Sequence, residues 1–309
     1  MPLALTAILP VVVLLVIGWI LRHRAPLDPS FWRGLEWMSY RVFTPALFVT
    51  SIGRADLGAV PIGPLAVALT IPVLLVLGIL FGAAGLLRIT GPRLTSLVQG
   101  SVRVNTYLGL MFATALHGEE GIATYAIASA VMVPLVNVVC VSALARWGDG
   151  VDEPRPRFGR ELVTNPLIQG CVIGIVVNVS GLRLDGPIAT VLDLLAAPAL
   201  VTGTLIAGAA LTLAFRRRDL LDIGIAVLLK LLVLPALAVT CAVLLGIDGV
   251  VLSAVVIIAA VPTAPSAYVL ARRMGGDHRL MASITGVQTV AALVTVPLAL
   301  AVLEVVTTR

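Results

Sequence analysis

A short run of polar residues interrupts an apolar segment in the first half of the chain. The string GSVRVNTYLG places Arg103, Asn105 and Thr106 inside this segment. Asparagine is a good N-cap but a poor residue for a helix interior, so the string predicts a helix break with Asn105 at the start of the following half-helix. The free N–H groups and the positive dipole end of such a half-helix favour the binding of an anion.

A second apolar segment contains two prolines three residues apart. In VPTAPSAYVLA, Pro262 and Pro265 remove two backbone donors, which predicts a second helix break. Thr263 or Ser266 can cap the half-helix that follows, and either can also contact a substrate. Both breaks lie about 12–15 Å from one end of their segment at helical rise, near the middle of a membrane. Two crossed, broken helices would aim two helix N-termini at one cavity.

Each of the other polar residues within apolar segments has two possible roles, one in substrate binding and one in structure. Asn105, Asn137 and Gln288 either line a binding cavity or hydrogen-bond a neighbouring helix, as intramembrane amides often do. Arg103 and Lys230 either face the interior of the protein or extend along the helix to reach the membrane surface. Together with the residues at the two breaks, these five form the predicted substrate-binding set.

Several kinds of chemistry are absent from the sequence. No Asp or Glu lies at the middle of an apolar segment, so the acidic pair of a sodium/proton exchanger is missing. There is no P-loop, no HExxH string and no Ser/His/Asp arrangement, and the three histidines fall in loops or at segment ends. We therefore expect neither an enzyme nor a cofactor or metal site. A receptor with a soluble output domain is also disfavoured, because the loops are short.

The composition is that of an integral membrane protein. The chain is 59% hydrophobic and 12% charged, with a mean hydropathy of +1.08. The pI of about 9.6 could suggest nucleic acid, but no basic and aromatic residues alternate to form a stacking surface. Each apolar segment is about long enough to cross a bilayer. The predicted spans are 3–21, 36–53, 62–87, 95–116, 121–146, 165–181, 190–214, 221–246, 249–272 and 279–303.

The basic residues predict the orientation of these spans. Of the 21 Lys and Arg residues, 15 fall in loops after odd-numbered spans, and only Arg54, Arg183 and Arg309 fall on the opposite side or at a terminus. Since cytoplasmic loops carry the excess of basic residues, both termini should lie outside the cell membrane. The charged, proline-rich stretch 147–164 should be a cytoplasmic linker.

The two halves of the chain share a pattern of prolines and glycines. ILPVVVLLVIG and NPLIQGCVIG each place a proline eight residues before a glycine. Pro-Ala-Leu recurs at 45–47 and 198–200, and Val-Pro-Leu recurs at 133–135 and 296–298. An odd number of five spans in each half would invert the second copy in the bilayer. We therefore predict an all-α fold of two inverted five-helix repeats, residues 1–147 and 165–309, joined by a linker at 148–164.

At these strings the chain resembles the auxin efflux carrier family, which includes the PIN-type auxin carriers. The resemblance rests above all on RVNTYLGLMFATALHGEEG and VPTAPSAYVLARRMG. It implies ten helices with crossed breaks, with Asn105-Thr106 and Pro262 at the crossing. It also implies transport of small organic anions, such as auxin, malate or malonate. We therefore expect a secondary carrier in the lipid bilayer that works by alternating access between the two repeats, and we include a homodimer among the expected partners. Val104 replaces the proline of the PIN crossing, which leaves open a softer break and a substrate other than auxin.

A second kind of carrier remains open at this point. The sodium-coupled bile-acid carriers share the expected architecture, but sodium sites usually include acidic or carbonyl ligands. This chain offers only amides, hydroxyls and backbone groups at the two breaks.

Overall fold

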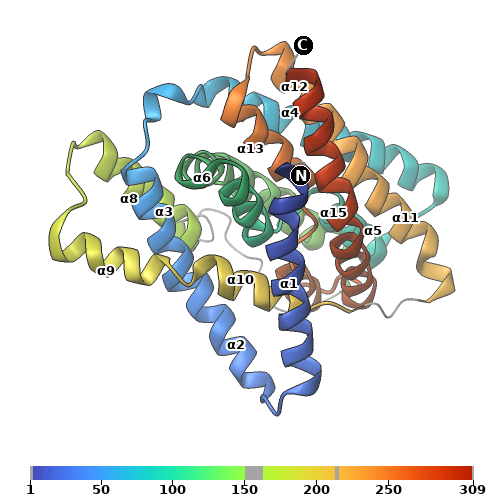
Figure 1. Cartoon of the computed structure of the whole chain (residues 1–309). Helices are drawn as coiled ribbons and strands as arrows, with labels where there is room; N and C mark the ends of the chain where they lie inside the picture. Colours follow the sequence, from blue (N-terminus) through green and yellow to red (C-terminus); the bar gives the residue numbers. More distant parts are fainter. Residues whose placement is uncertain (1–2, 150–162, 213–215, 308–309) are drawn as a thin grey trace.

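The chain is helical in every part that the structure describes. The computed structural model describes residues 3–149, 163–212 and 216–307, and these ranges contain no strand (Figure 1). The helices of the first half are α1 (Leu3–Arg24), α2 (Pro29–Met38), α3 (Thr44–Gly53), α4 (Ile62–Leu87), α5 (Gly91–Val102) and α6 (Thr106–Trp147). Those of the second half are α8 (Pro166–Val179), α9 (Gly186–Ala196), α10 (Ala199–Ala209), α11 (Leu220–Leu228), α12 (Leu234–Leu244), α13 (Gly249–Ala260), α14 (Ser266–Arg273) and α15 (His278–Thr307).

The prediction of an all-helical membrane protein is confirmed. Five helical stretches are long and apolar enough to cross a bilayer, namely 62–87, 91–147, 186–209, 217–244 and 278–302. Two shorter apolar helices, α8 and α13, also lie where spans were predicted. The number of ten spans, their inversion and the division into two repeats stay predictions. The linker at 148–164 lies mostly outside the described residues.

Two helices contain a widened turn just before a proline. A π-helical segment (Ser39–Phe43) joins α2 to α3, whose second residue is Pro45. Another (Leu229–Val233) joins α11 to α12, whose second residue is Pro235. Proline donates no hydrogen bond and its ring crowds the carbonyl four residues earlier. A π-helical turn makes room for the ring and lets the helix continue.

The helices pack in two bundles. We call α1, α2, α3, α8, α9 and α10 the frame bundle, in which α3 packs against α8 and α9, and α1 packs against α10. We call α4, α5, α6 and α11–α15 the crossing bundle, in which α13 packs against α6 and α12, and α12 packs against α4. Helix α6 joins the two bundles through its contacts with α1, α3 and α10 (Figure 1).

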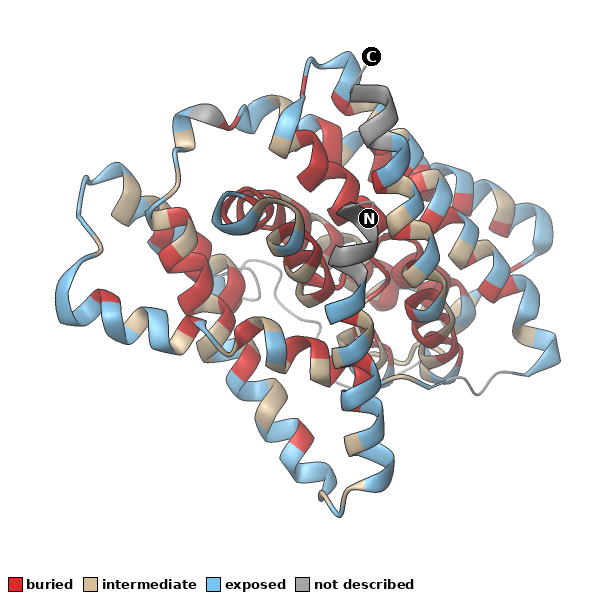
Figure 2. Cartoon of the chain, in the orientation of Figure 1, coloured by how far each residue is buried: buried red, intermediate tan, exposed pale blue. Residues whose placement is uncertain are grey.

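Each bundle combines helices from both halves of the sequence. The helix pairs α3–α8 and α1–α10, for example, join residues more than a hundred positions apart. Burial follows the same plan, since α6 and α13 at the centre are mostly buried whereas the outer faces of the surrounding helices are exposed and apolar (Figure 2). Apolar faces of this kind suit contact with lipid tails. Neither bundle therefore corresponds to one half of the sequence.

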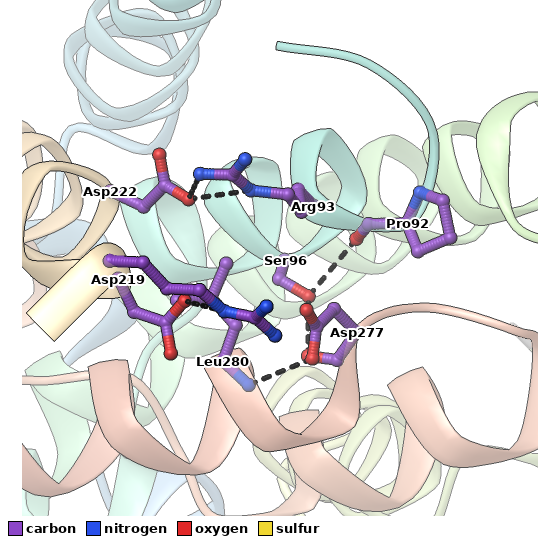
Figure 3. A network of polar contacts seen from close by, with 8 residues as sticks. Pro92, Arg93, Ser96, Asp219, Asp222, Asp277 and Leu280 are labelled. Carbon is purple, nitrogen blue, oxygen red and sulfur yellow. Dashed lines mark hydrogen bonds and ion pairs between the residues drawn. The ribbon is translucent and has the colours of Figure 1, made fainter. Parts of the chain in front are cut away.

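A polar network ties three helices of the crossing bundle together at their basic-side ends. Both Nε and Nη2 of Arg93 in α5 donate to Oδ2 of Asp222 in α11, the former at 2.9 Å (Figure 3). Ser96 of α5 donates to the carbonyl of Asp277 at 2.8 Å, and Asp277 caps α15 by accepting from the N–H of Leu280. The Asp222 side chain is 1% exposed, whereas that of Arg93 is 51% exposed. The ion pair is therefore buried on one side only.

This asymmetry predicts unequal effects of removing the two partners. Arg93→Met leaves the Asp222 carboxylate buried without a cation, a situation that costs on the order of 3 kcal/mol in other buried pairs. Asp222→Asn leaves an arginine that can turn into solvent, so the thermal stability should fall less. Melting temperatures in detergent check this, and the double variant should recover most of the loss. Equal losses for the two single variants would contradict the buried ion pair.

Candidate functional site

The first helix break lies between α5 and α6. Helix α5 ends at Val102, and Arg103 turns the backbone to extended geometry (φ −65°, ψ 153°). Asn105 is the N-cap of α6, since its Oδ1 accepts from the N–H of Leu108 at 3.3 Å. The predicted break and the predicted cap are both present. Thr106 follows as the first residue of α6 and is buried.

The second break lies between α13 and α14 and repeats the same turn. Helix α13 ends at Ala260, and Val261 is extended (φ −64°, ψ 147°). The prediction that Thr263 or Ser266 caps the next half-helix is wrong. The N-cap of α14 is Pro265, which makes no side-chain hydrogen bond, and Ser266 is already the first helical residue. Pro265 sets this start because its fixed φ suits the beginning of a helix.

The two breaks contact each other directly. The N–H of Asn105 donates to the carbonyl of Pro262 at 2.8 Å. The hydroxyl of Thr263 donates to the carbonyl of Gly100 at 3.2 Å. That carbonyl has lost its helical partner because α5 ends two residues later. The predicted crossing of two broken helices is therefore a hydrogen-bonded structure, and Thr263 serves it with its side chain.

Gln288 of α15 completes this structure. Its side chain is fully buried, and its Nε2 donates to the carbonyls of Gly100 (2.7 Å) and Ala226 (3.0 Å). Its Oε1 accepts from the N–H of Thr263 at 3.1 Å. The amide thus joins α5, α11 and the second break, and it has little capacity left for a ligand.

Arg103 and Ser266 face each other across the crossing. Nη2 of Arg103 lies 3.5 Å from Oγ of Ser266, at the long limit for a hydrogen bond. The guanidinium also interacts with the thiol of Cys140, in the second part of α6. Asn137 lies one helical turn before Cys140 and is half-buried. Arg103 thus lies between Ser266 at the start of α14 and Cys140 of α6.

Two side-chain donors of the first break, residues 103–105, have no hydrogen-bond partner. They are Nδ2 of Asn105 and Nη1 of Arg103, both of which are buried. The orientation of the Asn105 amide follows from its cap, because only Oδ1 can accept from the N–H of Leu108. Buried donors are nearly always paired in proteins, so two unpaired ones point to a missing acceptor.

Lys230 occupies a different place from the other predicted residues. It lies in the π-helical segment after α11, is fully buried, and donates from Nζ to the carbonyl of Ala259 at 2.9 Å. Its ammonium therefore reaches the C-terminal end of α13 and does not extend to the basic face.

A cavity of about 710 Å³ lies between the two bundles. Its walls come from α3, the junction of α9 and α10, residues 119–127 of α6 and the start of α13. None of the predicted site residues lines it. Its charged lining consists of one arginine and five carboxylates: Arg54, Asp56, Glu119, Glu120, Asp193 and Asp248.

The single arginine of this cavity is already paired. Arg54 donates to both carboxylate oxygens of Asp193, at 2.8 and 2.9 Å, and this hydrogen bonding raises the pKa of Arg54. The remaining carboxylates make the cavity acidic at its surface. In the part of the chain that the structure describes, no group of three or more His, Cys, Asp or Glu residues is placed to hold a metal ion.

Several buried polar residues escaped the sequence reasoning. Gln99 of α5 is fully buried with both amide atoms unpaired, and Ser101 in the next turn has an unpaired hydroxyl. Asp222 is buried near the end of its helix, where a carboxylate is ordinarily solvated. Ser101 lies within the string GSVRVNTYLG that predicts the break and Gln99 lies directly before it, and only this position could have singled them out.

The hydrogen bonds of Gln288 predict a structural role. Gln288→Leu leaves the N–H of Thr263 without its partner, at about 1–3 kcal/mol, and removes one of the two donors of the Ala226 carbonyl, which keeps the N–H of Leu229. The melting temperature should fall strongly. Thr289→Val is the matched control on the same helix, because it removes one bond to the carbonyl of Thr285 within α15. Similar melting temperatures for the two variants would show that Gln288 does not hold the crossing.

Comparison with known proteins agrees with this architecture. An uncharacterized transporter of Methanothermobacter thermautotrophicus is 27% identical over 301 residues, which covers 94% of this chain and 95% of that protein. A family model described as membrane transport protein matches residues 3–300, nearly the whole chain. The protein with the crossed helix breaks is therefore a member of this family of membrane transport proteins, the auxin efflux carrier family.

Proposed function

We propose that this transporter carries a small organic anion and binds its carboxylate at the crossing of the two broken helices. The observation that carries the proposal is the pair of buried donors without partners, Nδ2 of Asn105 and Nη1 of Arg103. Both can donate and neither can accept, so the ligand that completes them must supply acceptors. A carboxylate does so and also balances the charge of Arg103.

The helix ends around these donors support the same ligand. Helices α6 and α14 both begin at the crossing, at Thr106 and Ser266. The positive ends of their dipoles face the region of Arg103, and the start of α14 has no side-chain cap. Asn105, Arg103, Thr106 and Ser266 are thus the proposed ligands, and Asn137 a candidate in the second part of α6. Thr263, Gln288 and Pro262 would hold the crossing in shape.

Alternating access would arise from movement of the crossing bundle against the frame bundle. The cavity lies between these bundles, so it is a candidate path from one membrane face toward the crossing. The carboxylates that line the cavity repel an anion, so the substrate would pass through the cavity but would not bind there. The ring of Tyr107, one residue into α6, packs against Gly203 of α10, where a Cβ atom would approach the ring to 2.1 Å. This contact is one place where the bundles would slide.

Variants of Asn105 can separate binding from capping. Asn105→Ser removes the amide donor but keeps an oxygen that can cap α6, whereas Asn105→Ala removes both. Both variants should lose most of the uptake of malonate or indole-3-acetate into proteoliposomes. Only Asn105→Ala should also lose about 1 kcal/mol of stability, seen as a lower melting temperature.

The charge of Arg103 provides the second arm of this test. Arg103→Gln should reduce uptake of the acids, and Arg103→Lys should retain part of it. Malonamide and indole-3-acetamide, the neutral analogues, should not be carried. Transport of the amides as fast as the acids, or full activity in both Asn105→Ser and Arg103→Gln, would overturn the anion site.

The proposed orientation places both termini outside the cell membrane. In a background without the three native cysteines, Glu119→Cys should react with an impermeant maleimide added to intact cells, because Glu119 is exposed on the predicted outer face. Arg216→Cys, exposed on the predicted inner face, should react only after the cells are opened. The reverse pattern would invert the orientation.

A further inference from the structure

Lys230 is a cation held entirely inside the protein. Its side chain is 0% exposed, and its Nζ lies 2.9 Å from the carbonyl oxygen of Ala259. Lys230 belongs to none of the ion pairs Arg54–Asp193, Arg93–Asp222 and Arg218–Asp219 of the described residues. A buried cation without a carboxylate is costly. The carbonyl and its surroundings must therefore compensate the charge.

The end of α13 supplies this compensation. The carbonyl of Ile258 would ordinarily pair with residue 262, which is a proline and has no N–H. The carbonyl of Ala259 would pair with the N–H of Thr263, which donates instead to Gln288. The last turn of α13 therefore presents free carbonyls, and the negative end of its dipole points the same way. Lys230 meets this end from the neighbouring π-helical segment.

A helix C-terminus broken inside a membrane is where carriers coordinate coupling cations. Unwound carbonyls and half-helix C-terminal ends hold the sodium ion in several transporter folds. In this chain the side-chain nitrogen of Lys230 lies at the C-terminal end of α13, bonded to the carbonyl of Ala259. The π-helical turn before Pro235 positions the lysine there, since it carries Lys230 within the segment Leu229–Val233.

We propose that Lys230 is a built-in cation that takes the place of a coupling sodium ion at the end of α13. In its ammonium form it neutralises the negative end of the half-helix, so this end needs no ion from solution. The consequence for transport, independence of sodium, rests on the proposed function, whereas the occupancy of the helix end does not. Lys230 is in this view a positioning residue for the crossing and not a ligand of the substrate.

The test measures thermal unfolding of the whole protein without substrate. Wild type, Lys230→Ala and Lys230→Met are melted in sodium, ethylammonium and choline chloride at equal ionic strength. Leu229→Ala is the matched control, because Leu229 is 4% exposed and its truncation also opens a space but frees no carbonyl. The alanine variant leaves room for a small cation, whereas methionine fills the space with an apolar side chain.

The wild type should melt at the same temperature in the three salts. Lys230→Ala should melt lower in choline and recover by several degrees, saturably, with sodium or ethylammonium. Lys230→Met should stay low in every salt, and Leu229→Ala should show no preference among them. These results need no knowledge of the substrate, so they stand even if the anion site is wrong.

Three results would overturn the proposal. One is a Lys230→Met variant as stable as the wild type, which would show that the ammonium does not stabilise the helix end. Another is a Lys230→Ala variant that responds to no cation. The third is a saturable rise in the melting temperature of the wild type with sodium, which decides the matter even if neither lysine variant can be purified.

Discussion

The structure depends on how two broken helices satisfy their backbone groups inside an apolar environment. Each unpaired N–H or carbonyl there costs several kcal/mol, so a break persists only where other groups replace the lost bonds. The two breaks do this for each other, with the N–H of Asn105 on the carbonyl of Pro262 and the hydroxyl of Thr263 on that of Gly100. Gln288 adds three bonds from α15. This pairing holds α5, α11 and α15 against the two breaks.

Because the two breaks contact each other through several hydrogen bonds, the groups that stay unpaired on the first break are informative. The carbonyls of the crossing accept from the N–H of Asn105 and from the side chains of Thr263 and Gln288, whereas the unpaired groups of Asn105 and Arg103 are donors. The acidic cavity between the bundles has the opposite character, since its only arginine is neutralised by Asp193. An anion would therefore be repelled at the surface and attracted at the crossing. Such an arrangement favours a site reached only when the bundles rearrange.

The sequence predicted the helices and both breaks because these follow from local chemistry. Apolar length, proline and the capping preference of Asn105 act within a few residues of themselves. The bundles could not be predicted, since the pairing of α3 with α8 depends on surfaces far apart in the chain. The hydrogen-bond partners of Gln288 and Lys230 also depend on how the helices pack. From the sequence, Gln288 could line a cavity or bond a neighbouring helix, and Lys230 could face the interior or extend to the membrane surface. Capping by Ser266 was wrong because Pro265 starts the helix one residue earlier than the serine could.

Arg103 and Lys230 lie near opposite ends of helix dipoles, so their electrostatic surroundings differ. The C-terminal end of α13 meets the charge of Lys230, whereas the corresponding end of α5 meets only the neutral groups of Thr263 and Gln288. Lys230 is thus balanced by the negative end of a helix dipole. Arg103 instead lies beside the positive ends of α6 and α14, which add to its charge. No carboxylate is paired with Arg103 among the ion pairs of the described residues, so under the proposed function an anionic substrate would supply the balancing charge.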